Sequence, residues 1–218
     1  MGKSKYRPIF EYTLNGKTLE VSDKERDLGV TITSDLSPDQ HIATICKSTY
    51  ALLANIRIAF RHLDLESFRN IYLTYVRPKL EYAAPLWNPH RKKDIRKLER
   101  VQRHATRLVP EIRDLPYNER LKRLAIPSLQ SRRLRGDMIT VYKFLKGFDN
   151  VDSKQLFARA DSSTRGHPLK IKKKITKSDV RKFFFSARVV DKWNSLQEEV
   201  IEAKTIHSFK KRYDQRYL

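Results

Sequence analysis

The residues with the clearest chemical potential are basic side chains that recur along two predicted helices. The set comprises Arg91, Lys92, Lys93, Arg96, Lys97, Arg100, Arg103, Arg107, Arg132, Arg133 and Arg135. Guanidinium and ammonium groups along a helix face suit the backbone phosphates of a nucleic-acid duplex, which such groups hold without reading the base sequence. The alternative interpretation is a solvated basic face that contacts nothing.

A second basic segment lies nearer the C-terminus and is followed by aromatic residues. Its lysines are Lys170, Lys172, Lys173 and Lys174, and the aromatic residues are Phe183, Phe184, Phe185 and Trp193. Basic residues beside aromatic rings could stack unpaired bases. A phenylalanine run at the start of a helix is more often part of a hydrophobic core, and we favour that interpretation for the rings. The four lysines remain candidate nucleic-acid-binding residues.

Residues with a catalytic or metal-binding pattern are not found. Two-metal phosphoryl transfer needs paired carboxylates on rigid elements, and the sequence has no Asp-Asp pair. Glu198 and Glu199 are adjacent on a predicted helix, so their side chains point about 100° apart. The six histidines are scattered without metal-ligand spacing. We therefore expect no catalytic residue, no bound metal and no cofactor.

The net charge indicates the kind of partner. The chain carries 46 Lys and Arg against 25 Asp and Glu, a formal charge of +21. Residues 91–135 hold fifteen basic and five acidic residues, and residues 165–192 hold ten and two. A charge this far from zero is self-repelling unless a polyanion neutralises it. RNA, DNA or an RNA·DNA duplex is therefore the expected partner.

Cysteine content and hydropathy indicate the compartment. Cys46 is the single cysteine, which excludes an intrachain disulfide framework and favours a reducing environment. No apolar run approaches the ~18 residues of a membrane span, and no signal-peptide pattern is present. We expect an intracellular protein, nuclear or cytoplasmic, that is not secreted and has no membrane partner. The lysines from Lys170 to Lys174 could also act as a nuclear signal.

The elements that position these residues are mainly helices. Residues 6–34 are predicted to form three short strands, with Asn15-Gly16 as a hairpin turn and 28–33 as the third strand. Three short strands alone bury too little apolar surface to be stable, so we expect this segment to be the edge of a larger structure. Helices are predicted at 37–62, from 64 to a break or kink before Pro78, and at 91–109, 117–124, 128–146, 183–193 and 205–217; 169–175 is predicted as a short strand.

Seven short phrases spread over almost the whole chain carry a family resemblance. They are Lys24-Glu-Arg-Asp-Leu-Gly-Val30, Ser34-Asp-Leu36 with His41-Ile42, Tyr75-Val-Arg-Pro-Lys-Leu-Glu-Tyr82, Leu86-Trp-Asn-Pro89, Leu98-Glu-Arg-Val-Gln-Arg103 with Ala105-Thr-Arg107, Gln130-Ser-Arg-Arg133 with Gly136-Asp137, and Phe184-Phe-Ser-Ala-Arg188 with Trp193-Asn194. In this order and spacing they resemble the C-terminal part of the reverse transcriptase of non-LTR (long interspersed, jockey-like) retrotransposons.

The resemblance implies a specific role for each part of the chain. In that family a helical thumb follows the palm and grips the primer–template duplex. By resemblance, Leu28, Gly29 and Val30 map to the last palm element, near the primer end. The Phe/Tyr-x-Asp-Asp motif of the palm, the fingers and the upstream endonuclease have no counterpart in this sequence. The resemblance therefore implies a non-catalytic fragment of an RNA-directed DNA polymerase, truncated after the catalytic motif.

These inferences predict a mainly α fold in three parts. Residues 1–36 are the β-hairpin or three-strand remnant of a palm, 37–150 a helical thumb-like bundle, and 151–218 a basic, α-rich C-terminal extension. The predicted function is binding of primer–template nucleic acid through a basic helical surface. A separately encoded palm domain is a second predicted partner. The alternatives are a helical protein-interaction module and a decayed element copy without selected function.

Overall fold

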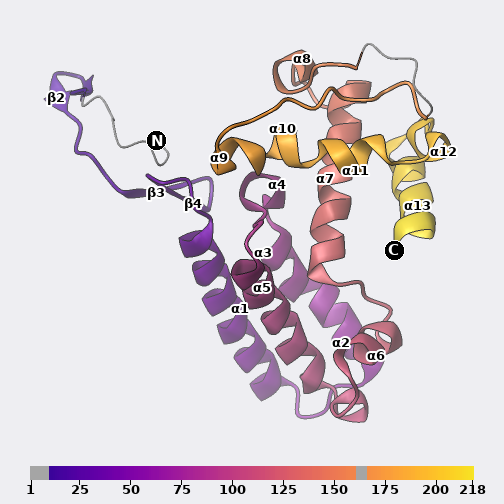
Figure 1. Ribbon diagram of the computed structural model, residues 1–218. Helices are drawn as coiled ribbons and strands as arrows, with labels where there is room; N and C mark the ends of the chain where they lie inside the picture. Colours follow the sequence, from indigo (N-terminus) through magenta and orange to yellow (C-terminus); the bar gives the residue numbers. More distant parts are fainter. Residues whose placement is uncertain (1–9, 161–165) are drawn as a thin grey trace.

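The chain is mainly helical, with two small β-hairpins at its N-terminal end, as predicted (Figure 1). The computed structural model describes residues 10–160 and 166–218. Buried side chains gather in two hydrophobic cores, one built from residues between Val30 and Leu129 and one from residues between Met138 and Tyr213. One long helix, α7 (Leu129–Lys146), contributes to both cores.

The N-terminal strands pair as two separate hairpins rather than as one three-stranded unit. The strands are β1 (Thr13–Leu14), β2 (Lys17–Thr18), β3 (Lys24–Asp27) and β4 (Val30–Thr33). Asn15 and Gly16 have the positive φ angles of the predicted tight turn. Leu28 and Gly29 have φ angles of 44° and 83°, so they form a second tight turn between β3 and β4. The predicted third strand therefore begins only at Val30.

Two long helices that run in the same direction carry the first core. The helical elements around it are α1 (Asp39–Ala59), α2 (Leu65–Ile71), the π-helix η1 (Tyr72–Val76), α3 (Arg77–Glu81), α4 (Ala84–Trp87), α5 (Lys92–Ala105), the 3-10 turns η2 (Thr106–Leu108) and η3 (Pro110–Ile112), and α6 (Tyr117–Arg123). α1 and α5 pack side by side (Figure 1). Their buried residues recur at three- and four-residue spacing, which places the basic residues of α5 on its outer face.

The break predicted before Pro78 takes the form of a π-helical turn. Asp64 caps α2, the helix predicted to start at this residue, with its carboxylate accepting from the backbone N–H of Ser67 at 2.7 Å. In η1 the backbone N–H of Arg77 donates to the carbonyl of Tyr72, five residues earlier. A wider turn at this place lets the helix continue through Pro78, which has no N–H to donate.

The second core is built by the second half of α7 and the C-terminal segments. These are α8 (Ser153–Leu156), α9 (Asp179–Lys182), α10 (Phe185–Arg188), α11 (Val190–Asn194), α12 (Glu198–Ile201) and α13 (Ile206–Tyr217). The single helix predicted over 183–193 is divided between α10 and α11, and the strand predicted over 169–175 forms only one isolated bridge, at Ile171. Of the four rings predicted to be core residues, Phe185 and Trp193 are buried, Phe183 is half-buried, and Phe184 is exposed, so the prediction is wrong for Phe184.

The two cores are joined at a buried ion pair. Arg188 donates from Nη2 to Asp137 Oδ1 at 2.9 Å and to the Pro85 carbonyl at 2.8 Å. Asn88 Nδ2 donates to Asp137 Oδ2 at 2.9 Å. Asp137 is 2% exposed, and burial raises the pKa of its carboxyl although Arg188 opposes that shift. The contacts tie α7, α10 and the segment around α4 to one another, and α7 contributes to both cores.

Replacing Arg188 with Ala should destabilise the whole chain. The change leaves the Asp137 carboxylate buried without its counter-ion, so the free energy of unfolding should fall by about 3–5 kcal/mol in urea titrations at neutral pH. The matched control is Asp191→Ala, which removes the exposed ion pair with Lys173 and should cost less than about 1 kcal/mol. Equal losses in the two variants would contradict the account of the junction.

Candidate nucleic-acid interface

The basic residues of α5 form one continuous exposed stripe. The α5 stripe consists of Lys93, Arg96, Lys97, Arg100, Arg103 and, in the following turn η2, Arg107, all exposed to solvent. Residues three and four apart share one face of a helix, so these side chains leave α5 on the same side. The stripe is about 21 Å long at the helical rise per residue. Lys92 is exposed beside its first turn.

Three members of the stripe have partners within the chain. Lys93 Nζ lies 2.6 Å from Asp39 Oδ2, and Arg91 Nη1 lies 3.4 Å from the same oxygen. Lys97 lies 3.6 Å from Asp94 Oδ1. The Arg103 guanidinium covers the ring of Tyr117, 4.4 Å from its centroid.

The remaining members of the stripe are exposed and have no ion-pair partner among the described residues. Arg96, Arg100 and Arg107 form no ion pair with any residue in the described part of the chain. Since neutralising a phosphate with these groups breaks no internal contact, they are the residues of the stripe best suited to bind a polyanion.

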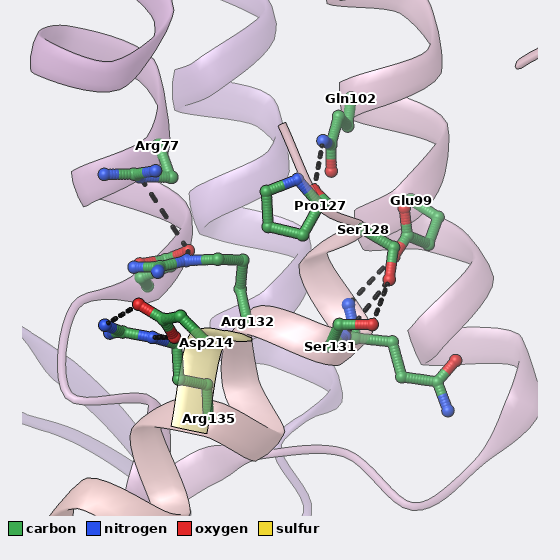
Figure 2. Close-up of polar contacts among 11 residues, drawn as sticks. Arg77, Glu99, Gln102, Pro127, Ser128, Ser131, Arg132, Arg135 and Asp214 are labelled. Atoms are coloured by element: carbon green, nitrogen blue, oxygen red, sulfur yellow. Dashed lines mark hydrogen bonds and ion pairs between the residues drawn. The ribbon is translucent and has the colours of Figure 1, made fainter. Parts of the chain in front are cut away.

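The three arginines of α7 have partners within the molecule; Arg133 is buried, and Arg132 and Arg135 are half-buried. Arg132 makes a two-pronged contact with Glu81, at 2.8 and 2.9 Å. Arg135 makes the same kind of contact with Asp214 of α13, with Nη2 at 2.7 Å from Oδ2 (Figure 2). Arg133 is 3% exposed and donates from Nε to Asn88. The expectation that these three residues face a phosphate backbone is therefore not met, because internal carboxylates and the core hold them.

The lysines of the C-terminal segment lie in the part of the chain that packs on the second core. Lys172, Lys173 and Lys174 follow the buried Ile171 and are exposed, and Lys173 is paired with Asp191 at 2.5 Å. Lys170 is half-buried. The α5 stripe belongs to the first core, so the two basic sets predicted from the sequence lie on segments that pack on different cores.

The residues assigned to the primer end by resemblance are tied to the first core. The hydroxyl of Tyr82 donates to the Leu28 carbonyl at 2.9 Å, and its ring lies 3.5 Å from where a Cβ on Gly29 would stand. Val30 is buried. Trp87 donates from Nε1 to the Tyr82 carbonyl at 2.8 Å. Tyr82 therefore fixes the second hairpin against the end of α3.

Sequence reasoning missed three arginines that lie around Arg107. Arg57 and Arg61, at and beyond the end of α1, and Arg113, after η3, line a surface hollow that Arg107 also lines. Their side chains come from positions about fifty residues apart in the sequence. The basic spacing within α1 gives no signal of this cluster, because it forms only when the ends of α1 and α5 pack together.

A pair of carboxyl groups lies at the start of α5. Asp94 is fully buried, and neither of its oxygens has a hydrogen-bond donor in the described residues; Asp39 Oδ1 is in the same state. Burial raises the pKa of Asp94, and the neighbouring Asp39 raises it further. The contact with Lys93 lowers the pKa of Asp39 to about 2. The two shifts are opposite in direction, so Asp94 binds a proton more readily than Asp39 does.

Comparisons with known proteins leave the function to be argued from this geometry. Neither a protein-family model nor a solved structure matches the chain. A stretch of 128 residues, 57% of the chain, is 25% identical to the Caenorhabditis elegans protein named "Uncharacterized protein B0403.1", and the match spans 65% of that protein. Among the described residues, no group of three or more His, Cys, Asp or Glu side chains is placed to hold a metal ion. No described helix combines the length and apolar character needed to cross a bilayer.

Replacing Asp94 with Asn should stabilise the chain, and the gain should grow with pH. In the native chain the raised pKa of Asp94 means that the folded state binds more protons than the unfolded state above pH ~3.9. Stability therefore falls as pH rises through the folded pKa. Asn stays neutral at this buried position, so urea titrations should show little gain near pH 4 and about 1 kcal/mol at neutral pH. Asp114→Asn, at an exposed carboxylate, is the control, and a loss of stability in Asp94→Asn at neutral pH would contradict the raised pKa of Asp94.

Proposed function

We propose that the chain binds the phosphate backbone of a nucleic-acid duplex through the α5 stripe, with an RNA·DNA primer–template as the preferred form. The observation that carries the proposal is the row of Arg96, Arg100 and Arg107, whose charges have no ion-pair partner in the described part of the chain. Nucleic acid supplies the missing negative charge, and the net charge of +21 favours such a partner over a neutral one.

The rigidity of α5 supports a duplex as the ligand. Leu98, Val101 and Ala105 on its opposite face are fully buried, so the helix has one fixed position against α1. A row of cations on a fixed helix presents regular charge to a regular phosphate backbone without rearrangement on binding. In this proposal the interaction is steeply salt-dependent and reads little or no base sequence.

We further propose that the chain corresponds to the thumb and tail of a non-LTR retrotransposon reverse transcriptase and contributes binding rather than catalysis. Three of the phrases that carry the resemblance come together in space. The Gly136-Asp137 phrase meets Arg188 of the Phe184 phrase and Asn88 of the Leu86 phrase at the buried ion pair. A shared fold would require these phrases to occur together, since each supplies one partner of a buried charge.

A second candidate function is docking of a separately encoded palm domain. The described N-terminal segment exposes several large apolar side chains, namely Phe10, Tyr12, Leu14, Leu19, Val21 and Leu28. A patch of this kind is more typical of an interface than of a free surface. Mixing the chain with such a palm and measuring primer extension tests this candidate, and no stimulation over the palm alone counts against it.

Changing Arg96, Arg100 and Arg107 together to Gln should weaken binding of every duplex alike. Fluorescence anisotropy with a labelled RNA·DNA duplex and a DNA duplex should show affinity falling about tenfold to a hundredfold near physiological salt. The slope of log affinity against log salt should become shallower by roughly two to three, since each lost phosphate contact contributes about one.

The matched control removes three exposed positive charges from another helix. Lys210, Lys211 and Arg216 of α13 are exposed and can be changed to Gln together. This variant has the same net charge as the α5 variant, so it corrects for general electrostatic attraction. Equal losses in the two variants would mean that the charge is generic, and unchanged binding in the α5 variant would overturn the assignment of the interface.

A further inference from the structure

The ends of α1 and α5 enclose a surface groove beyond the α5 stripe. It consists of two adjoining hollows of about 380 and 490 Å³ that share Arg57, His104 and Leu108. We call it the arginine groove. Hollows of this size are in the range of small-ligand pockets, about 300–1,000 Å³.

The floor of the groove is apolar and partly aromatic. Leu53 and Leu63 are buried beneath it, and Leu108 is half-buried. The rings of Tyr50 and His104 meet edge to face, 5.4 Å between centroids, at one end. Phe60, 46% exposed, lines the other hollow. A flat apolar group of a ligand that lies against these surfaces is removed from water, which favours binding.

The rim of the groove is strongly positive. Arg57, Arg61, Arg107 and Arg113 line it, all four are exposed, and none forms an ion pair with a described residue. Arg113 Nε donates to the Arg107 carbonyl, which holds these two residues at the end of η2. Four cations around an apolar floor match a ligand that combines phosphates with flat, apolar faces.

We propose that the arginine groove holds unpaired nucleotides that extend from the end of a duplex bound on the α5 stripe. Arg107 belongs to both the stripe and the groove rim, so the two surfaces are continuous. In this arrangement the bases lie on the floor near His104 and Phe60, and the phosphates lie against Arg57, Arg61 and Arg113. Stacking on aromatic or guanidinium planes tolerates any base, so the site selects strand state and not sequence. This inference rests on the proposed duplex binding.

The test is the gain in affinity that a single-stranded extension gives to one RNA·DNA duplex. The duplex is compared blunt and with an extension of about three nucleotides of either polarity, by anisotropy at fixed salt. The native chain should bind one extended form at least about fivefold more tightly than the blunt form. Ala54→Trp, which fills the floor without altering charge, should abolish this gain and leave affinity for the blunt duplex unchanged, since Ala54 lines the groove but not the stripe.

The matched control is Ala51→Trp, at an exposed position one turn earlier on α1 that does not line the groove. It should retain the gain, and thermal unfolding of both variants checks that the fold is intact. Arg61→Gln supplies a second, charge-based variant that should reduce the gain. Equal binding of blunt and extended duplexes by the native chain, or a gain that survives Ala54→Trp, would overturn the inference.

The outcomes also separate this inference from the proposed function. Tight binding of the blunt duplex without any gain from the extension would contradict the proposed role of the arginine groove and would support duplex binding by the α5 stripe. Failure to bind any duplex would defeat both. A groove that instead binds an acidic amphipathic peptide, with loss of that binding in Ala54→Trp, would replace the nucleotide ligand with a protein partner.

Discussion

The fold depends on ion pairs that neutralise the charged side chains of α7, the helix shared by the two hydrophobic cores. Asp137 is buried, and its negative charge is balanced by Arg188 and by the amide of Asn88. Removing either charge of such a pair leaves the other uncompensated at a cost of several kcal/mol, so the three segments are restricted to one arrangement. Two further ion pairs, Arg132 with Glu81 and Arg135 with Asp214, connect α7 to α3 and to α13. The first core, and with it α5, is held in place as a result.

This constraint divides the arginines of the chain into two classes with different roles. Those of α7 are used inside the molecule, where planar guanidinium groups match carboxylates in two-pronged contacts. Those of α5 and the arginine groove keep their charges at the surface because the opposite face of α5 is entirely apolar apart from Asp94 and Gln102. The proposed grip on a duplex and the proposed hold on unpaired nucleotides both follow from this second class.

Local features of the structure could be predicted from the sequence, and contacts between distant segments could not. The helix starts near residues 64, 128 and 205 and the turn at Asn15-Gly16 depend on neighbouring residues, and they were predicted correctly. The sequence around Arg132, Arg133 and Arg135 resembles that of the α5 stripe. The partners of two of them, Glu81 and Asp214, are distant in the sequence, so these ion pairs could not be predicted. The arginine groove was missed for the same reason, because its rim comes from the ends of two helices.

Arginine-specific chemical modification, mapped by mass spectrometry with and without an RNA·DNA duplex, tests the division between surface and internal arginines most directly. In the free chain Arg96, Arg100 and Arg107 should react readily, whereas the buried Arg133 should not. Adding the duplex should protect the three residues of the α5 stripe and leave the exposed Arg216 of α13 reactive. Protection of Arg216 with unchanged reactivity along α5 would contradict the account, because it would place the nucleic acid on a different face of the molecule.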